Sequence, residues 1–248
     1  MQGTNNNMQG TNNASNNIKF NSSQYFGTPV WNAEAPQFLK MMLKLTDGYL
    51  KHTQKTVMNK ANKERNKKFK TKVDDFGVSN HTESFNNDPK AKGFVDFCGA
   101  RSYEFLDWCG FDLRNHSLHF TECWAQEFSK KGGGHHNTHQ HWNQHVSGFY
   151  FLKCSERTSV PVFHDPRPGA SMTRLPQKDS NKITFANESV HYTVKPGTMV
   201  IIPGYTPHQY PVDYGLDPFR FIHWNIQAVP SSISKQTSMK KKNDQTNK

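Results

Sequence analysis

The sequence lacks long apolar segments, and this absence excludes several classes of protein. No apolar run approaches the ~20 residues that a membrane-spanning helix requires. The first 20 residues are polar and rich in Asn, and MQGTNN occurs twice, at Met1–Asn6 and at Met8–Asn13. Such a segment cannot serve as a secretory signal, and we expect residues 1–20 to be disordered.

Cysteine is also scarce, and its four positions form no CxxC pair. Cys98, Cys109, Cys123 and Cys154 have apolar neighbours in the sequence. An even count does not indicate disulfides in a chain of this length, so we expect reduced, buried thiols in a cytoplasmic protein. The sequence contains no Gly-rich phosphate loop, no Ser or Cys in the setting of a nucleophile, and no convincing general acid/base pair.

The net charge of +11 is concentrated in two segments. Residues 51–72 hold nine Lys or Arg and one acidic residue, and residues 231–248 hold five Lys and one Asp. The remainder carries 17 basic and 18 acidic residues, for a net charge of −1. A solvated basic helix face explains this pattern, and attraction to nucleic acid is the alternative.

The N-terminal half has the periodicity of helices. Apolar residues recur at helical spacing after Pro36, which predicts a helix that continues through the Lys-rich stretch to about Lys68. Residues 71–88 are polar and predict a loop. Asp88-Pro89 then resembles a helix start, and Gly110 follows the last apolar pair of that helix.

From residue 117 the pattern changes to that of short strands. Alternation of apolar and polar residues predicts a strand near 117–128, and shorter strands follow at 146–152, 160–163, 189–194, 199–202 and 219–227. No helical pattern separates them, so we expect a mainly β fold, an antiparallel jelly roll with the earlier helices packed outside it. The expected organisation is a disordered N-terminus (1–20), a helical region (21–115), a jelly-roll core (116–230) and a basic disordered tail (231–248).

Histidines gather just before the strand predicted at 146–152. Residues 132–145 contain His135, His136, His139, His141 and His145. Imidazole is a common ligand of catalytic transition metals, and residues i and i+2 of an extended segment point to the same side. His139 and His141 can therefore face one metal ion. His208 follows the strand predicted at 199–202, and a jelly roll would return it beside these two residues.

In the order of its motifs, the segment from Trp124 to Asn225 resembles the 2-oxoglutarate/Fe(II)-dependent oxygenases. It looks closest to an uncharacterised phage and marine bacterial subgroup with the pattern W…G…H-x-H…SGxYYL…DPR…PG…P…H…R…N. The matching residues are Trp124, Gly134, His139-Gln140-His141, Ser147–Leu152, Asp165-Pro166-Arg167, Pro196-Gly197, Pro203, His208, Arg220 and Asn225.

This resemblance implies a dioxygenase that uses Fe(II), 2-oxoglutarate and O2, with ascorbate as an expected stimulant. Oxidative decarboxylation of 2-oxoglutarate to succinate and CO2 would accompany oxidation of a second substrate, with hydroxylation as the default outcome. The substrate, a protein side chain or a small molecule, is not identified by the sequence. The resemblance also places the protein in the cytoplasm, of a bacterial host if a phage encodes it.

The chain departs from this superfamily at one metal position. The usual ligand set is two His and one carboxylate, written H-x-D…H, and here His141 occupies the carboxylate position. His141 itself, Asp165, or water or another group would complete the metal site. Asp165 has a simpler interpretation as a turn residue that pairs with Arg167.

The resemblance assigns Arg220 to the distal carboxylate of 2-oxoglutarate, for which a planar guanidinium is suited. An internal Asp or Glu partner is the alternative. Tyr150, Tyr205 and Asn225 would add hydrogen bonds to the co-substrate, although core packing is the better expectation for an aromatic residue on a strand. Two other functions stay open: a metal-binding cupin without oxygenase activity, and a basic structural or nucleic-acid-associated protein.

Overall fold

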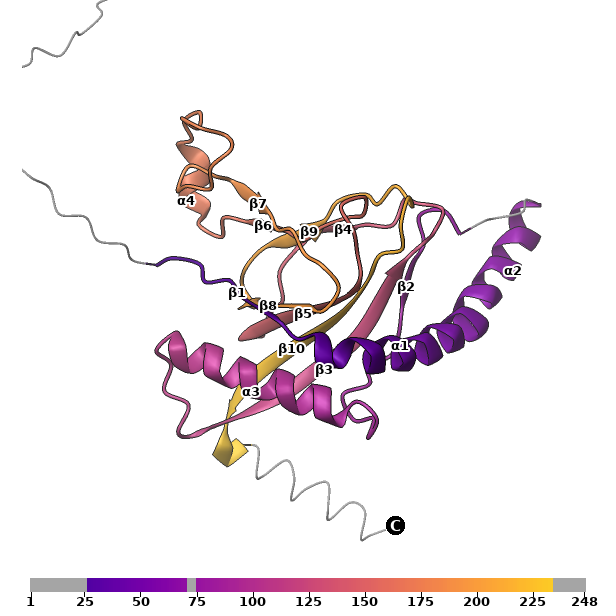
Figure 1. Ribbon diagram of the computed structural model, residues 1–248, viewed down its shortest axis with the longest axis horizontal. Coiled ribbons are helices and arrows are strands. Elements are labelled where there is room, and N and C mark those ends of the chain that lie inside the picture. The colour runs from indigo at the N-terminus through magenta and orange to yellow at the C-terminus, as the bar shows by residue number, and fades with distance from the viewer. Residues whose placement is uncertain (1–25, 71–74, 234–248) are drawn as a thin grey trace, which may run out of the picture.

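The computed structural model describes residues 26–70 and 75–233. Residues 1–20 and, of the tail 231–248, residues 234–248 were expected to be disordered and lie outside the described residues, whereas residues 231–233 are helical. The chain forms two facing antiparallel sheets, with helices covering the outer face of the larger sheet (Figure 1). This arrangement is the mainly β jelly roll with external helices that the sequence predicts.

The larger sheet has six strands in the order β1-β8-β5-β10-β3-β2. These strands are β1 (Trp31–Glu34), β8 (Thr198–Pro203), β5 (Val146–Lys153), β10 (Arg220–Pro230), β3 (His116–Phe128) and β2 (Ser79–His81). The smaller sheet has the order β4-β9-β6-β7, formed by β4 (His136–His139), β9 (His208–Tyr210), β6 (Val162–His164) and β7 (Ser189–His191). A short helix, α4 (Pro168–Met172), lies between β6 and β7.

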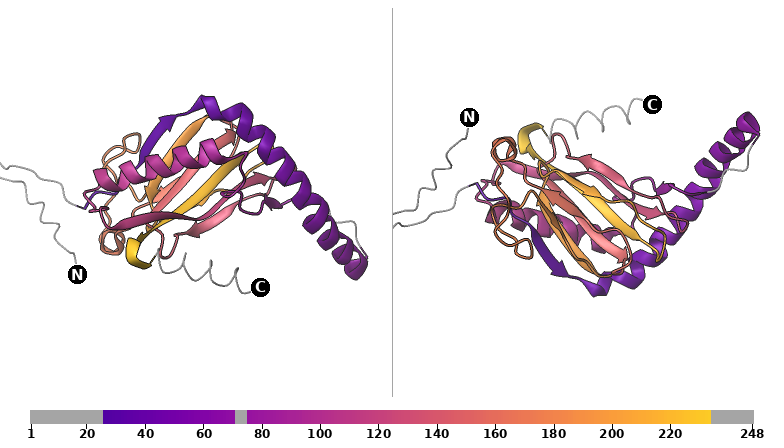
Figure 2. Two further views of the ribbon diagram at one scale, coloured as in Figure 1. Left: turned by 90° about the horizontal axis from the view of Figure 1, so that it is seen from below. Right: turned by 90° about the horizontal axis from the view of Figure 1, so that it is seen from above.

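The described residues of the N-terminal half form five helical segments. They are η1 (Pro36–Phe38), α1 (Leu39–Thr53), a π-helical turn η2 (Gln54–Met58), α2 (Asn59–Phe69) and α3 (Lys92–Trp108). Of these, α1 and α3 pack on the outer face of the six-stranded sheet. Figure 2 shows α1 and α3 lying across the sheet, while α2 extends beyond the body of the protein. Among the described residues, no helix has both the length and the apolar character needed to cross a bilayer.

Strand alternation separates two apolar cores. On β10, Ile222 and Trp224 face the helices and join the first core, whereas Phe221 joins the second core between the two sheets. The same alternation on β5 sends Tyr150 toward the helices and Phe149 and Phe151 into the space between the sheets. Of the polar side chains on the six-stranded sheet, only those on its inner face can therefore reach the histidines.

Candidate metal centre

Three histidines converge where the smaller sheet meets the inner face of the larger one. β4 and β9 are antiparallel neighbours, and His139 lies directly opposite His208. His141 follows β4, and its backbone N–H donates to the carbonyl of Gly204 at 3.0 Å. One ring nitrogen from each of these three residues lies within 4.8 Å of the other two. The structure thus brings together the three histidines singled out from the sequence.

The rings of His139 and His208 are held in the same way. The Nδ1 of His139 lies 2.8 Å from the carbonyl oxygen of Asn137, and the Nδ1 of His208 lies 2.9 Å from that of Thr206. Since a carbonyl oxygen only accepts, each Nδ1 carries the proton, and the lone pair is on Nε2. Histidines that bind metals in proteins are commonly held by such a bond from the other ring nitrogen. Both side chains therefore present Nε2 as a ligand atom.

His141 is held differently. Its Nδ1 lies 2.9 Å from Nδ2 of Asn225, and its Nε2 is buried without a hydrogen-bond partner. Asn225 is itself fixed, because Ser147 Oγ donates to its Oδ1 at 2.6 Å and its amide group donates to Glu122. While the amide donates to Nδ1, the proton of a neutral His141 resides on Nε2. Turning the Asn225 amide so that its oxygen faces Nδ1 would move that proton to Nδ1 and free Nε2, at the cost of the hydrogen bond from Asn225 to Glu122.

The electrostatic setting keeps His141, His208 and the nearby His136 neutral. Burial lowers the pKa of His208 to about 2, and burial together with neighbouring imidazoles lowers the pKa of His141 to about 3. Burial likewise lowers the pKa of His136 to about 4. Since a metal binds the neutral imidazole, protons do not compete for these ligand atoms near neutral pH.

A second group of donors adjoins the first and was not anticipated from the sequence. Ligand atoms of Glu122, His141 and His223 also lie within 4.8 Å of one another. Glu122 is on β3 and His223 on β10, both on the inner face of the six-stranded sheet. The signal for His223 was present in the sequence, as a histidine inside the apolar strand FRFIHWNIQ.

Asp165 does not belong to either donor group. It follows β6, and its carboxylate accepts from the Nε and Nη2 of Arg167 at 2.9 and 2.8 Å. The backbone N–H of Arg167 also donates to Asp165 at 3.0 Å. These bonds to Arg167 lower the pKa of the Asp165 carboxyl group. Of the two interpretations of Asp165, the structure shows the turn residue paired with Arg167.

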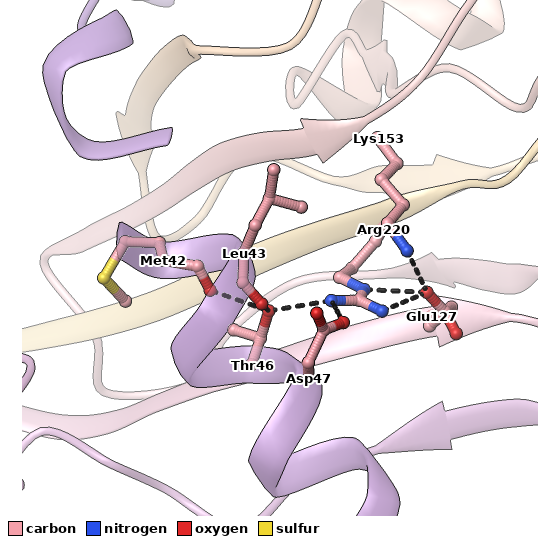
Figure 3. A network of polar contacts seen from close by, with 7 residues as sticks. All are labelled: Met42, Leu43, Thr46, Asp47, Glu127, Lys153 and Arg220. Atoms are coloured by element: carbon pink, nitrogen blue, oxygen red, sulfur yellow. Dashed lines mark hydrogen bonds and ion pairs between the residues drawn. The ribbon is translucent and has the colours of Figure 1, made fainter. Parts of the chain in front are cut away.

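Arg220 lies on the opposite face of the six-stranded sheet from the histidines, toward α1 (Figure 3). Its Nε and Nη2 donate to Glu127 Oε2 at 2.7 and 2.6 Å. Its Nη1 donates to Asp47 at 2.7 Å and to Thr46 at 3.0 Å. The guanidinium therefore has internal carboxylate partners, the alternative considered for it from the sequence, and the structure does not bring it to the histidines.

The other residues considered for the co-substrate are dispersed. Tyr150 points to the helix side, where its hydroxyl donates to the carbonyl of Ala35 at 2.7 Å. Tyr205 is 53% exposed and lies beside a cavity of about 600 Å³. Asn225 alone of this set contacts one of the three histidines, through the Nδ1 of His141.

The donor set fits a first-row transition metal. Three neutral imidazoles supply nitrogen ligands of the kind that Fe(II), Co(II) and Zn(II) accept. The Nε2 of His141 is buried without a hydrogen-bond partner, and it could bind an ion once its proton has moved to Nδ1. The His139–His208 pair gives two ligand atoms whose direction is set by backbone carbonyls.

Comparisons with known proteins agree with this chemistry. Residues 122–215 match the model of a family described as "Putative 2OG-Fe(II) oxygenase". No curated protein matches the sequence of the chain.

Solved structures of low sequence identity resemble the fold. An oxidoreductase of the 2OG-Fe(II) oxygenase family from Burkholderia pseudomallei aligns with a TM-score of 0.41 and 14% identity. That alignment covers 62% of this chain and 62% of the other. A prolyl hydroxylase from Trichoplax adhaerens, in complex with a hypoxia inducible factor peptide fragment, gives a TM-score of 0.47 and 11% identity, with 79% and 82% covered.

AviO1 from Streptomyces viridochromogenes gives a TM-score of 0.48 and 13% identity, with 81% of this chain and 90% of that one covered. Likeness at this level does not identify a substrate. The matched segment contains all three converging histidines and Glu122. Residues 122–215 are therefore similar to the 2OG-Fe(II) oxygenases, and the chain spans less than two thirds of the length of the first of the solved structures it resembles.

Proposed function

We propose that the protein is a 2-oxoglutarate-dependent hydroxylase in which His139, His141 and His208 hold Fe(II). The observation that carries this proposal is the cross-strand pair of His139 and His208, with each Nδ1 bonded to a backbone carbonyl and each Nε2 left as a ligand atom. Bound iron would supply the activation of O2 that couples decarboxylation of 2-oxoglutarate to oxidation of the substrate. We also propose that the protein belongs to the subgroup of these oxygenases with the H-x-H…SGxYYL pattern.

The protein's own side chains orient the ligands and exclude water. Phe149 lies edge-on to His208, with ring centroids 5.2 Å apart, so one side of the site is apolar. Asn225 selects which nitrogen of His141 carries the proton, and Ser147 fixes Asn225. A dry, rigid environment of this kind strengthens electrostatic interactions inside a site.

The substrate would approach along the loop that follows His141. A cavity of about 600 Å³ adjoins this loop and contains the exposed aromatic side chains of Trp108, Phe111 and Tyr205 together with Gln144 and His145. The three histidines do not line this cavity, and His141 is joined to its edge only through the carbonyl of Gly204, which lies between Pro203 and Tyr205 of the lining. A protein side chain or small molecule with an apolar or aromatic group suits such a lining.

The test is succinate formation from 2-oxoglutarate by protein purified without oxygen and supplied with Fe(II), O2 and ascorbate. Slow turnover is expected without a substrate, and His208→Ala and His139→Ala should each reduce it on the order of 100-fold or more, because ligand atoms are lost. His135→Ala is the matched control, since His135 is exposed and belongs to neither donor group. A wild type that binds neither Fe(II) nor 2-oxoglutarate would reject this function and favour a non-oxygenase cupin.

A second activity, binding of a polyanion such as DNA, is favoured by one observation. The helix α2 extends away from the body (Figures 1 and 2) and carries Lys60, Lys63, Arg65, Lys67 and Lys68 against Glu64. All six side chains are exposed. A projecting basic helix can approach phosphates without moving the oxygenase domain, and its binding would weaken as salt increases.

A further inference from the structure

His223 is buried in a polar arrangement that no hydrogen bond satisfies. The residue is 1% exposed, and neither of its ring nitrogens makes a hydrogen bond of normal length. Its Nε2 lies 3.6 Å from Glu122 Oε1, which is too far for a hydrogen bond. Trp124 and Phe149 pack against its ring, with centroids 4.8 and 5.0 Å away. The long contact with Glu122 therefore leaves this buried imidazole without a hydrogen bond of normal length, and a bound ion between the two side chains would supply a closer partner.

The neighbouring donors point to what that group is. His141 lies between two other imidazoles, with its ring centroid 4.7 Å from that of His223 and 5.2 Å from that of His208. Glu122 is the carboxylate in this neighbourhood, and donor atoms of Glu122, His141 and His223 lie within 4.8 Å of one another.

We propose that Glu122, His141 and His223 form a second metal-binding position, beside the one formed by His139, His141 and His208. Two imidazoles and one carboxylate suit Fe(II), Mn(II) or Co(II), and the carboxylate offsets the charge of the ion. The side chain of Glu122 is 37% exposed, which gives an ion a route from solvent. His141 is the residue that the two positions share, and with both ions bound it would bridge them as an imidazolate, one nitrogen to each ion. Its ring proton would be released to solvent, and the Asn225 amide that now contacts Nδ1 would move aside.

Metal binding to the full chain tests the second position, and this test does not require catalytic turnover. Co(II) is the probe, with its stoichiometry measured by elemental analysis after desalting and its ligand field by visible absorption. We expect two ions per chain in the wild type and one in Glu122→Gln and in His223→Gln. His208→Ala should retain an ion whose binding is lost when Glu122→Gln is added. His135→Gln, a histidine change outside both groups, should leave both the stoichiometry and the spectrum unchanged.

Two other results discriminate between the proposals. A single ion that is lost in Glu122→Gln and kept in His208→Ala would support the second position and reject the three-histidine iron site. Binding that disappears in His208→Ala, with stoichiometry and spectrum unchanged in Glu122→Gln and His223→Gln, would overturn the second position and leave the proposed function intact. Glu122→Gln preserves the size and hydrogen bonding of the side chain, so the outcome does not rest on the buried His223 variant alone.

Discussion

Arg220 and Glu127 form a buried ion pair across β10 and β3, with Arg220 Nη2 2.6 Å from Glu127 Oε2. Their side chains are 4% and 11% exposed. The same guanidinium reaches Thr46 and Asp47 of α1, so it joins the first helix to the sheet (Figure 3). The arrangement gives Arg220 a structural role on the side of the sheet away from the histidines.

Replacing Arg220 should therefore reduce stability more than it changes use of 2-oxoglutarate. Arg220→Met leaves Glu127 buried with Lys153 as its remaining cationic partner, at 3.3 Å. Loss of one member of a buried pair typically costs about 3–5 kcal/mol. Urea unfolding measures this loss, and the KM for 2-oxoglutarate of the folded fraction should stay within about threefold of the wild type.

Asp47→Asn provides the comparison, because Asp47 is half exposed and contributes one of several bonds to the same guanidinium. It should cost roughly 1 kcal/mol or less. A folded, fully stable Arg220→Met protein with a KM for 2-oxoglutarate raised by tenfold or more would contradict the structural role and restore Arg220 as the anchor of the co-substrate.

The Ser-Gly pair at the start of β5 has a packing explanation that can be tested at Gly148. A Cβ added at Gly148 would lie 2.0 Å from Cε2 of Trp224, a fully buried side chain. Gly148→Ala should destabilise the protein by about 3 kcal/mol, the upper range for overpacking a core. Thermal and urea unfolding measure the change. A loss below roughly 0.5 kcal/mol would show that the indole moves freely.

Gly48→Ala is the matched control, since a Cβ at Gly48 on α1 would meet no atom within 4 Å. Alanine in place of a helical glycine should stabilise the protein by about 0.5–1 kcal/mol. Both variants add one methyl group, but the expected changes in stability have opposite signs. The comparison therefore separates a general effect of the added methyl group from steric conflict with Trp224.

Much of the fold could be predicted from the sequence because large apolar side chains repeat with the period of the element they occupy. The helices α1 and α3 and the strands β3, β5, β8 and β10 all lie at predicted positions. The strands β1, β2, β4 and β9 escaped prediction, β2 within the segment 71–88 predicted to be a loop, since each has only three or four residues and few apolar ones. Their pairing is set by contacts distant in the chain, which local periodicity does not record.

The residues of the candidate site could likewise be predicted only in part. His139, His141 and His208 could be selected from spacing and clustering, and the structure brings them together. The direction of Arg220 and Tyr150 could not be selected, because a shift of one residue along a strand moves a side chain to the other face. Glu122 and His223 were missed for a related reason: neither stands in a local cluster, and only the pairing of β3 with β10 places them near His141.

The cysteines should react slowly in the folded protein. Burial raises the pKa of Cys154 to about 12 and raises that of the half-buried Cys109, while Cys98 and Cys123 are fully buried. The thiolate is the reactive form, so at pH 8 a thiol of pKa 12 is ionised on the order of 10⁻⁴ of the time, and its labelling rate should rise with pH.

Mass spectrometry after brief alkylation at pH 7, 8 and 9 measures the rate at each position. Cys109 should be labelled first, and all four thiols should react together once the protein is unfolded in urea. Labelling of Cys98 or Cys123 at the rate of free glutathione would show that the first core opens far more readily than its packing indicates.

The basic helix α2 gives the last prediction, which concerns the polyanion. If α2 contacts phosphates, Lys63→Gln with Lys67→Gln should weaken binding to duplex DNA at low salt. Each lost contact removes about one unit from the slope of log K against log salt, so the slope should fall by about two. Lys40→Gln with Lys44→Gln changes the net charge equally on α1, where both side chains are exposed on the body of the protein. Equal loss in both pairs would indicate attraction by net charge alone, and a selective loss in the α2 pair would assign the contact to the projecting helix.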